Sequence, residues 1–131
     1  MKMLLTKKFC FEMAHALPGY NGKCANLHGH SYHLEVTVES HELNADGMGV
    51  DFHTLKQIVQ TTVVDRFDHA LVLPEGVAIE APNLVAVPFA PTTENLLLHF
   101  ARLLEPVMPA GARLHSLRLA EIDTSVAVLI L

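Results

Sequence analysis

One cysteine and three histidines fall within the stretch KCANLHGHSYH, residues 23 to 33 of the chain. Thiolate and imidazole groups both bind zinc and related metals, and both can carry protons near neutral pH. Either Cys24 binds a metal together with these histidines, or it stays free beside a metal that the histidines hold. The chain has 9 histidines in 131 residues, and this excess also favours metal chemistry.

Strand periodicity decides which histidines can share one ion. His28 and His30 are two residues apart on a predicted strand and leave the same face, whereas His33 points the other way. A third ligand must come from elsewhere, and His15 at the end of the adjoining strand is the best placed. Imidazole ligands favour zinc, with copper, nickel and iron as further candidates. A chance pairing of surface or core histidines is the alternative.

The role of Cys24 depends on the fourth position of this site. Three histidines leave zinc one open position, which is the arrangement of catalytic rather than structural sites. If the Cys24 thiolate fills that position, the site is closed and structural. If Cys24 stays free, the open position can take a substrate oxygen, and the thiolate can act as a base or a nucleophile.

Two further places carry titratable side chains that could do chemistry. Asp68 and His69 are adjacent after a predicted helix, and a histidine held by an aspartate suits general acid or base catalysis, although a solvated pair is the alternative. Glu121 lies late in the otherwise apolar segment LRLAEIDTSVAVL, so its carboxylate either faces water or is buried with a partner. A buried carboxylate could bind a planar NH and NH2 edge through two hydrogen bonds.

These residues depend on strands that hydrophobic periodicity predicts. Alternation in LLTKKFCFEMAH places Phe9, Phe11, Met13 and His15 on one face of a first strand. A second strand is expected over about 28–40, with apolar side chains alternating inward. The loop LPGYNGKCAN between the two strands is rich in turn residues, and an antiparallel pair is therefore expected.

Helical spacing of apolar residues predicts two helices. The first runs from about Phe52 to Val64 with Asp51 as its N-cap, and the second follows an N-cap at Thr92 and ends at Pro106. Short extended segments are expected at DHALVLPEG and at 84–89, and two strands at 114–121 and 125–131. The fold class predicted is α+β, with an antiparallel four-stranded sheet and two helices on one face.

Composition limits the kinds of protein that this chain can be. Its 131 residues suit a single domain spanning 1–131, and 50% hydrophobic against 18% charged residues predicts a folded chain. A net charge of -5 argues against nucleic-acid binding, which needs clustered lysine and arginine. Neither a signal peptide nor a membrane span is visible, so we expect the cytoplasm, where a disulfide between Cys10 and Cys24 is disfavoured.

Five motifs, FCFEMAH, KCANLHGH, FDHALVL, PTTEN and LAEIDTS, occur in this order between Phe9 and Val128. In order and spacing they resemble the 6-pyruvoyl-tetrahydropterin synthase family. The resemblance implies a zinc site made of His15, His28 and His30. It implies a catalytic base and a proton relay made of Cys24, Asp68 and His69. It also implies that a pterin is held by Glu121 at its pyrimidine edge and, from a neighbouring subunit, by Thr92 and Thr93.

The resemblance further implies a fold, an assembly and a reaction. The family has the tunnelling fold, whose subunits join their sheets into a barrel as trimers or hexamers. The three residues between Cys24 and His28 resemble the queuosine-pathway members. These are carbon–carbon lyases that convert 7,8-dihydroneopterin triphosphate to 6-carboxy-5,6,7,8-tetrahydropterin, acetaldehyde and triphosphate. Triphosphate elimination alone, as in the pyruvoyl-forming members, and a non-catalytic zinc- or pterin-binding protein are the alternatives.

The chain departs from the family pattern at a few positions around the expected pocket. Met13 stands where alanine is usual, Leu73 and Ala90 where asparagine is frequent, and Ile122 where threonine commonly follows the glutamate. None of these changes removes a metal ligand or a proton carrier, although they affect the shape of the pterin pocket. Lys23, beside Cys24, is the nearest candidate to neutralise the triphosphate.

Overall fold

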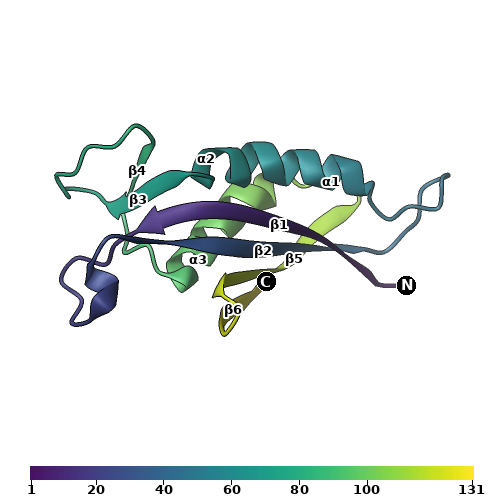
Figure 1. The fold of residues 1–131 in the computed structure, drawn as a ribbon. Coiled ribbons are helices and arrows are strands. Elements are labelled where there is room, and N and C mark those ends of the chain that lie inside the picture. The colour runs from purple at the N-terminus through teal and green to yellow at the C-terminus, as the bar shows by residue number, and fades with distance from the viewer.

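The computed structural model describes residues 1–131 as a curled mixed sheet of six strands with helices packed on one face (Figure 1). The strands are β1 (Met3–His15), β2 (His28–Ser40), β3 (Ala70–Pro74), β4 (Leu84–Val87), β5 (Ala112–Ile122) and β6 (Ser125–Ile130), in the order β4-β3-β1-β2-β5-β6. The helices are α1 (Phe52–Val59), α2 (Asp65–Phe67) and α3 (Thr93–Leu104). A π-helical turn, Gln60–Val64, joins α1 to α2, and short 3-10 turns lie at Lys23–Ala25 and Glu105–Val107.

The long β1–β2 hairpin forms the centre of the sheet. Its strands pair antiparallel along their whole length, and the predicted alternation is confirmed, since one face of each strand is buried. On that face Phe11 of β1 stacks on Tyr32 of β2 with ring centroids 5.4 Å apart, and Phe100 of α3 packs edge-on against Phe11 at 6.2 Å. The two rows continue into the buried His15 on β1 and the half-buried His30 and His28 on β2, so the core positions these rings.

The prediction of a four-stranded antiparallel sheet is wrong, because β3 and β4 extend the sheet in parallel beyond β1. β3 pairs with the last residues of β1, from Met13 opposite Ala70 to His15 opposite Val72. α1 and α2 carry the chain back along the sheet in the direction of β1 (Figure 1), so the strand that follows them runs parallel to β1. Strands of 5 and 4 residues are also too short to show a clear period in sequence.

The first helical segment extends beyond its predicted end. Its predicted N-cap is confirmed, because the Asp51 side chain accepts a hydrogen bond from the His53 backbone N–H. The helical path then continues to Phe67 rather than ending at Val64. The π-helical turn shifts the register of the helix, so that both Val64 and Phe67 are buried in the core, which a constant period of 3.6 residues does not predict.

The edges of the sheet are formed by β4 and β6. β6 carries apolar side chains that are largely exposed, with Val126 at 39%, Val128 at 56% and Ile130 at 71%. An unpaired edge with apolar side chains is a surface that another chain can cover. None of the helices has the length and apolar character needed to cross a membrane.

A buried carboxylate lies at the other end of β2 from the histidines. Glu39 is only 3% exposed and accepts hydrogen bonds from His41 Nε2 at 2.6 Å and from Arg113 at 3.2 and 3.3 Å, with Lys2 Nζ 3.4 Å away. These partners, His41 foremost, lower the pKa of Glu39 to about 2. A carboxyl group with a lowered pKa stabilises the fold above its unfolded pKa, about 4.3 for glutamate, and the stabilisation is lost as pH falls toward the folded pKa.

We therefore expect the free energy of unfolding to fall between about pH 4.5 and pH 2, because Glu39 must then take up a proton. Glu39→Gln should be less stable than the unchanged chain at neutral pH and should lose less stability across this interval. Urea unfolding followed by circular dichroism at a series of pH values measures both. Glu80→Gln removes an exposed carboxylate as a control. A Glu39→Gln profile parallel to that of the unchanged chain would contradict the assignment.

Candidate functional site

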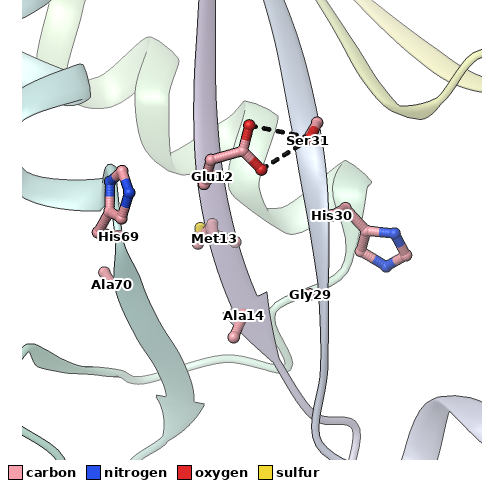
Figure 2. A pocket seen from close by; sticks show the side chains of 8 residues that line it. All are labelled: Glu12, Met13, Ala14, Gly29, His30, Ser31, His69 and Ala70. Carbon is pink, nitrogen blue, oxygen red and sulfur yellow. Dashed lines mark hydrogen bonds between the residues drawn. The ribbon is translucent and has the colours of Figure 1, made fainter.

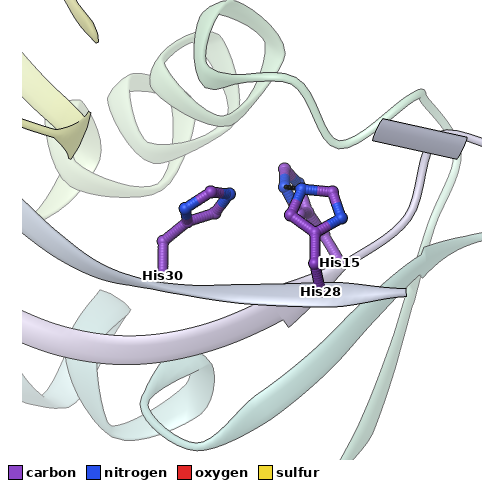
Figure 3. Close-up of side chains that lie close together, drawn as sticks. All are labelled: His15, His28 and His30. Carbon is purple, nitrogen blue, oxygen red and sulfur yellow. Dashed lines mark hydrogen bonds between the residues drawn. The ribbon is translucent and has the colours of Figure 1, made fainter. Parts of the chain in front are cut away.

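Three histidines converge at one end of the β1–β2 hairpin (Figure 3). His15 ends β1 and lies opposite His28, the first residue of β2, while His30 follows on the same face. Their candidate ligand atoms all lie within 4.8 Å of one another, and the Nε2 atoms of His15 and His28 are 3.1 Å apart. The structure thus brings together the three histidines that strand alternation selects, whereas His33 lies exposed on the opposite face.

Backbone carbonyl groups orient two of the rings. His15 Nδ1 is 2.8 Å from the Pro91 carbonyl oxygen, and His28 Nδ1 is 2.6 Å from the Asn26 carbonyl oxygen. A carbonyl oxygen only accepts hydrogen bonds, so each Nδ1 carries the hydrogen and each neutral ring has its lone pair on Nε2. Two lone pairs therefore face each other, and a cation bound by both would stabilise this arrangement.

The electrostatics of the cluster also suit a metal ion. Burial is the largest cause that lowers the pKa of both His15 and His30, so these rings are neutral and able to act as ligands at neutral pH. The buried Nε2 atom of His30 has no hydrogen-bond partner. A buried nitrogen without a partner is costly unless another interaction satisfies it. The three histidines could therefore hold a transition-metal ion.

Glu121 on β5 faces the same cluster. Its Oε1 atom is 3.3 Å from His15 Nε2 and 3.4 Å from His30 Nε2. Burial first, and then the neighbouring Glu121 charge, raise the pKa of Tyr32, whose hydroxyl therefore stays protonated next to the carboxylate. Of the two sequence-based possibilities for Glu121, the structure shows the partnered one, with the side chain 24% exposed rather than directed into open solvent.

Asp68 and His69 lie between α2 and β3 and are tied to β1. Asp68 Oδ1 accepts a hydrogen bond from the Glu12 backbone N–H at 2.9 Å and lies 3.0 Å from His69 Nδ1, and the His69 N–H bonds the Glu12 carbonyl. The Glu12 N–H is the largest cause that lowers the pKa of Asp68, so this carboxylate stays ionised. His69 adopts a φ of 60°, a left-handed backbone that is uncommon outside glycine and is often found at functional sites.

A pocket of about 340 Å³ opens beside this pair (Figure 2). Across it, the Ser31 hydroxyl bonds the Glu12 carboxylate, at 2.9 and 2.7 Å from the two oxygens. His69 lies on the β3 side of β1 in this view, while the His30 ring points away beyond β2. No hydrogen bond or ring contact joins His69 to the three histidines. His30 and His69 thus line one pocket of the chain, but His69 makes no direct contact with the histidine cluster.

Cys24 is also separate from the histidine cluster. It is exposed and lies in the 3-10 turn Lys23–Ala25, within the loop that leads from β1 into β2. Its carbonyl accepts a hydrogen bond from the Leu17 backbone N–H at 2.8 Å, which closes this loop. The converging group consists of histidines alone, and the Cys24 thiol is not one of its members.

The turn before α3 combines a helix cap with a contact to the histidines. Thr92 is the N-cap, as predicted, and its side chain accepts a hydrogen bond from the Asn95 backbone N–H at 3.2 Å. Thr93 is the first residue of α3 and is half-buried.

The sequence did not predict the roles of Pro91 and Asn26. Both act on the histidines through backbone carbonyl groups, which every residue type has.

Comparison with known proteins places the chain among tetrahydropterin synthases. The family profile described as 6-pyruvoyl tetrahydropterin synthase matches residues 4–130. A curated relative from Haemophilus influenzae, named 6-carboxy-5,6,7,8-tetrahydropterin synthase, is 46% identical over 72 residues, which cover 52% of this chain and 50% of that protein. The protein of the same name from Synechocystis sp. is 35% identical over 128 residues, covering 95% of this chain and 90% of its own length.

The fold agrees with this comparison. The solved structure of the 6-pyruvoyl tetrahydropterin synthase of Caenorhabditis elegans superimposes with a TM-score of 0.78 and 20% sequence identity. The superposition covers 99% of this chain and 96% of that chain, so the two share one fold. Because the family profile spans nearly the whole chain and relatives above 30% identity cover most of it, this protein belongs to the 6-pyruvoyl tetrahydropterin synthase family.

Proposed function

We propose that this chain is a zinc-dependent 6-carboxy-5,6,7,8-tetrahydropterin synthase of queuosine biosynthesis. In this reaction 7,8-dihydroneopterin triphosphate and one water molecule give 6-carboxy-5,6,7,8-tetrahydropterin, acetaldehyde and triphosphate, and the enzyme acts in the cytoplasm. The observation that carries the proposal is the convergence of His15, His28 and His30, with backbone carbonyls that orient two of the three rings. The names of the curated relatives support the choice of reaction.

The three histidines hold the metal through nitrogen atoms that the fold has already oriented. Zinc is the ion that best suits a set of imidazole ligands with an open position. When bound, it supplies a Lewis acid that stabilises negative charge developing on the side-chain oxygens of the substrate. The Pro91 and Asn26 carbonyls keep each Nε2 free of hydrogen, so the site needs no rearrangement of its rings to bind the ion.

Proton transfer is assigned to Cys24 and to the Asp68–His69 pair. The ionised Asp68 carboxylate accepts from His69 Nδ1, which leaves the lone pair of the neutral ring on Nε2. His69 Nε2 therefore takes up and returns protons at the carbon chain of the substrate, and the Cys24 thiolate does so from the other side. Glu121 accepts two hydrogen bonds from the NH and NH2 groups of the pterin edge. Lys23, next to Cys24, is the candidate to neutralise the triphosphate.

The site is completed by a neighbouring copy of the chain. His69 has no contact with the histidine cluster within one chain and its side chain is 76% exposed. The apolar residues of β6 are exposed at a free sheet edge. A homo-oligomer, either a trimer or two trimers as in the tunnelling fold, covers this edge. One subunit then supplies its proton relay, or Thr92 and Thr93, to the metal site of the next subunit.

Removal of one imidazole tests the metal site. We expect His28→Ala to lose stoichiometric zinc, because two remaining ligands bind the ion far more weakly than three. Metal analysis of the purified protein after dialysis measures this loss. His33→Ala removes a histidine from the same strand but from its exposed opposite face, and it should retain zinc. Equal zinc content in the two variants would refute the ligand assignment.

The cysteine is tested separately from the metal. Cys24→Ala should keep zinc and slow turnover of 7,8-dihydroneopterin triphosphate by about 10²–10⁴-fold, the range for loss of a proton-transfer group. Product analysis by mass, with acetaldehyde detection, also separates this reaction from triphosphate elimination alone. Cys10→Ala, at the other exposed cysteine, is the matched control. Loss of zinc in Cys24→Ala would instead make the thiolate a ligand.

Co-expression of two inactive variants tests the shared site. His30→Ala disables the metal site, and His69→Asn disables the proton relay while an asparagine tolerates the left-handed backbone at that position. If adjacent subunits share each site, random mixing restores about a quarter of the sites. Turnover of the co-purified mixture, compared with each variant alone, measures the recovery. A mixture no more active than its components shows that the two groups act within one chain.

A further inference from the structure

The Glu121 carboxylate lies among the three histidines, although the proposed reaction requires it at the pterin. In a tetrahedral zinc site with ligand distances of about 2.0–2.1 Å, neighbouring ligand atoms are about 3.3 Å apart, which is 1.63 times the bond length. The measured separations are 3.1 Å between His15 Nε2 and His28 Nε2, 3.3 Å from Glu121 Oε1 to His15 Nε2, and 3.4 Å from Glu121 Oε1 to His30 Nε2. Three of the six edges of such a tetrahedron therefore have about the expected length.

An ordinary hydrogen bond does not explain this contact. The hydrogen of the neutral His15 ring is on Nδ1, where it is donated to the Pro91 carbonyl, so Nε2 has none to offer Glu121. His30 Nε2 likewise forms no hydrogen bond. The His15 Nε2 lone pair and the carboxylate oxygen, directed at each other, repel unless a cation lies between them. The arrangement is therefore that of four ligands rather than of an ion pair.

We propose that Glu121 is the fourth ligand of the metal in the substrate-free protein and leaves it when the pterin binds. The metal-binding part rests on the histidine geometry, and the exchange rests on the proposed function. The carboxylate oxygen that contacts the cluster cannot remain there while the side chain turns to accept hydrogen bonds from the NH and NH2 groups of the pterin edge. The protonated Tyr32 hydroxyl lies beside His15, at 3.5 Å from its Nδ1, on the same side of the cluster.

This exchange makes access to the metal depend on recognition of the substrate. Before the pterin arrives, the fourth position is closed to stray anions such as free triphosphate. When the planar edge of the substrate attracts the carboxylate, the position opens beside a correctly placed substrate. Glu121 thus both recognises the substrate and controls when the metal becomes accessible, which is specificity by induced fit.

The test compares metal binding by Glu121→Gln with that by the unchanged chain. We expect Glu121→Gln to bind zinc at least about 10-fold more weakly in competition with a chelator, and to alter the visible absorption bands of the cobalt-substituted protein. Glu121→Asp, which keeps the charge but withdraws the carboxylate, should behave similarly. Glu35→Gln removes a carboxylate that pairs with Arg118 outside the cluster and should match the unchanged chain.

Addition of a pterin without a side chain then tests the exchange. Its pyrimidine edge should change the cobalt spectrum of the unchanged chain but not that of Glu121→Gln. If the zinc affinity and the cobalt spectrum are unchanged in Glu121→Gln, the inference is overturned. The proposed function then stays intact, with Glu121 as a substrate anchor only. A cobalt spectrum of the unchanged chain that does not respond to bound pterin would overturn the exchange. Failure of the unchanged chain to bind zinc would overturn both.

Discussion

Two hydrogen bonds, from His15 Nδ1 to the Pro91 carbonyl and from His28 Nδ1 to the Asn26 carbonyl, orient the rings on which the proposed metal site depends. They place the hydrogens on the outer nitrogens and direct the lone pairs inward. The first joins the end of β1 to the turn that begins α3, and the second joins the start of β2 to the loop before it. The protein thus obtains a preorganised set of ligands from ordinary secondary structure, because strand register and a helix cap supply the partners.

The same sheet explains why the two halves of the proposed active site lie apart in one chain. The histidines lie at the ends of the rows of β1 and β2 that face the core, and desolvation lowers the pKa of His15 and His30. The Asp68–His69 pair is instead bonded to the backbone of Glu12 on the β3 side of β1, and its imidazole is exposed. The histidine cluster and the Asp68–His69 pair therefore lie on different sides of the hairpin, and the proposed assembly of several chains would combine them.

The periodicity of the long elements predicts much of this. The alternation of β1 and β2 correctly placed His15, His28 and His30 on one face and His33 on the other, and the N-caps Asp51 and Thr92 followed from residue type. The segments of β3 and β4 were expected to be extended, but their parallel pairing with β1 was not, because such short strands carry no signal of their partners. The extension of the helix to Phe67 was not predicted because a π-helical turn breaks the period. The contact between Glu121 and the histidines depends on how β5 pairs with β2, and the local sequence pattern does not predict this register.

We propose that histidine nitrogens, without the thiolate of Cys24, hold the metal. X-ray absorption at the zinc edge of the purified, zinc-loaded protein tests it most directly, because sulfur and nitrogen ligands differ in distance. The account predicts only nitrogen and oxygen neighbours at about 2.0–2.2 Å, with the outer-shell scattering of three imidazole rings. A sulfur neighbour at about 2.3 Å would contradict it, since Cys24 would then close the site as a structural ligand.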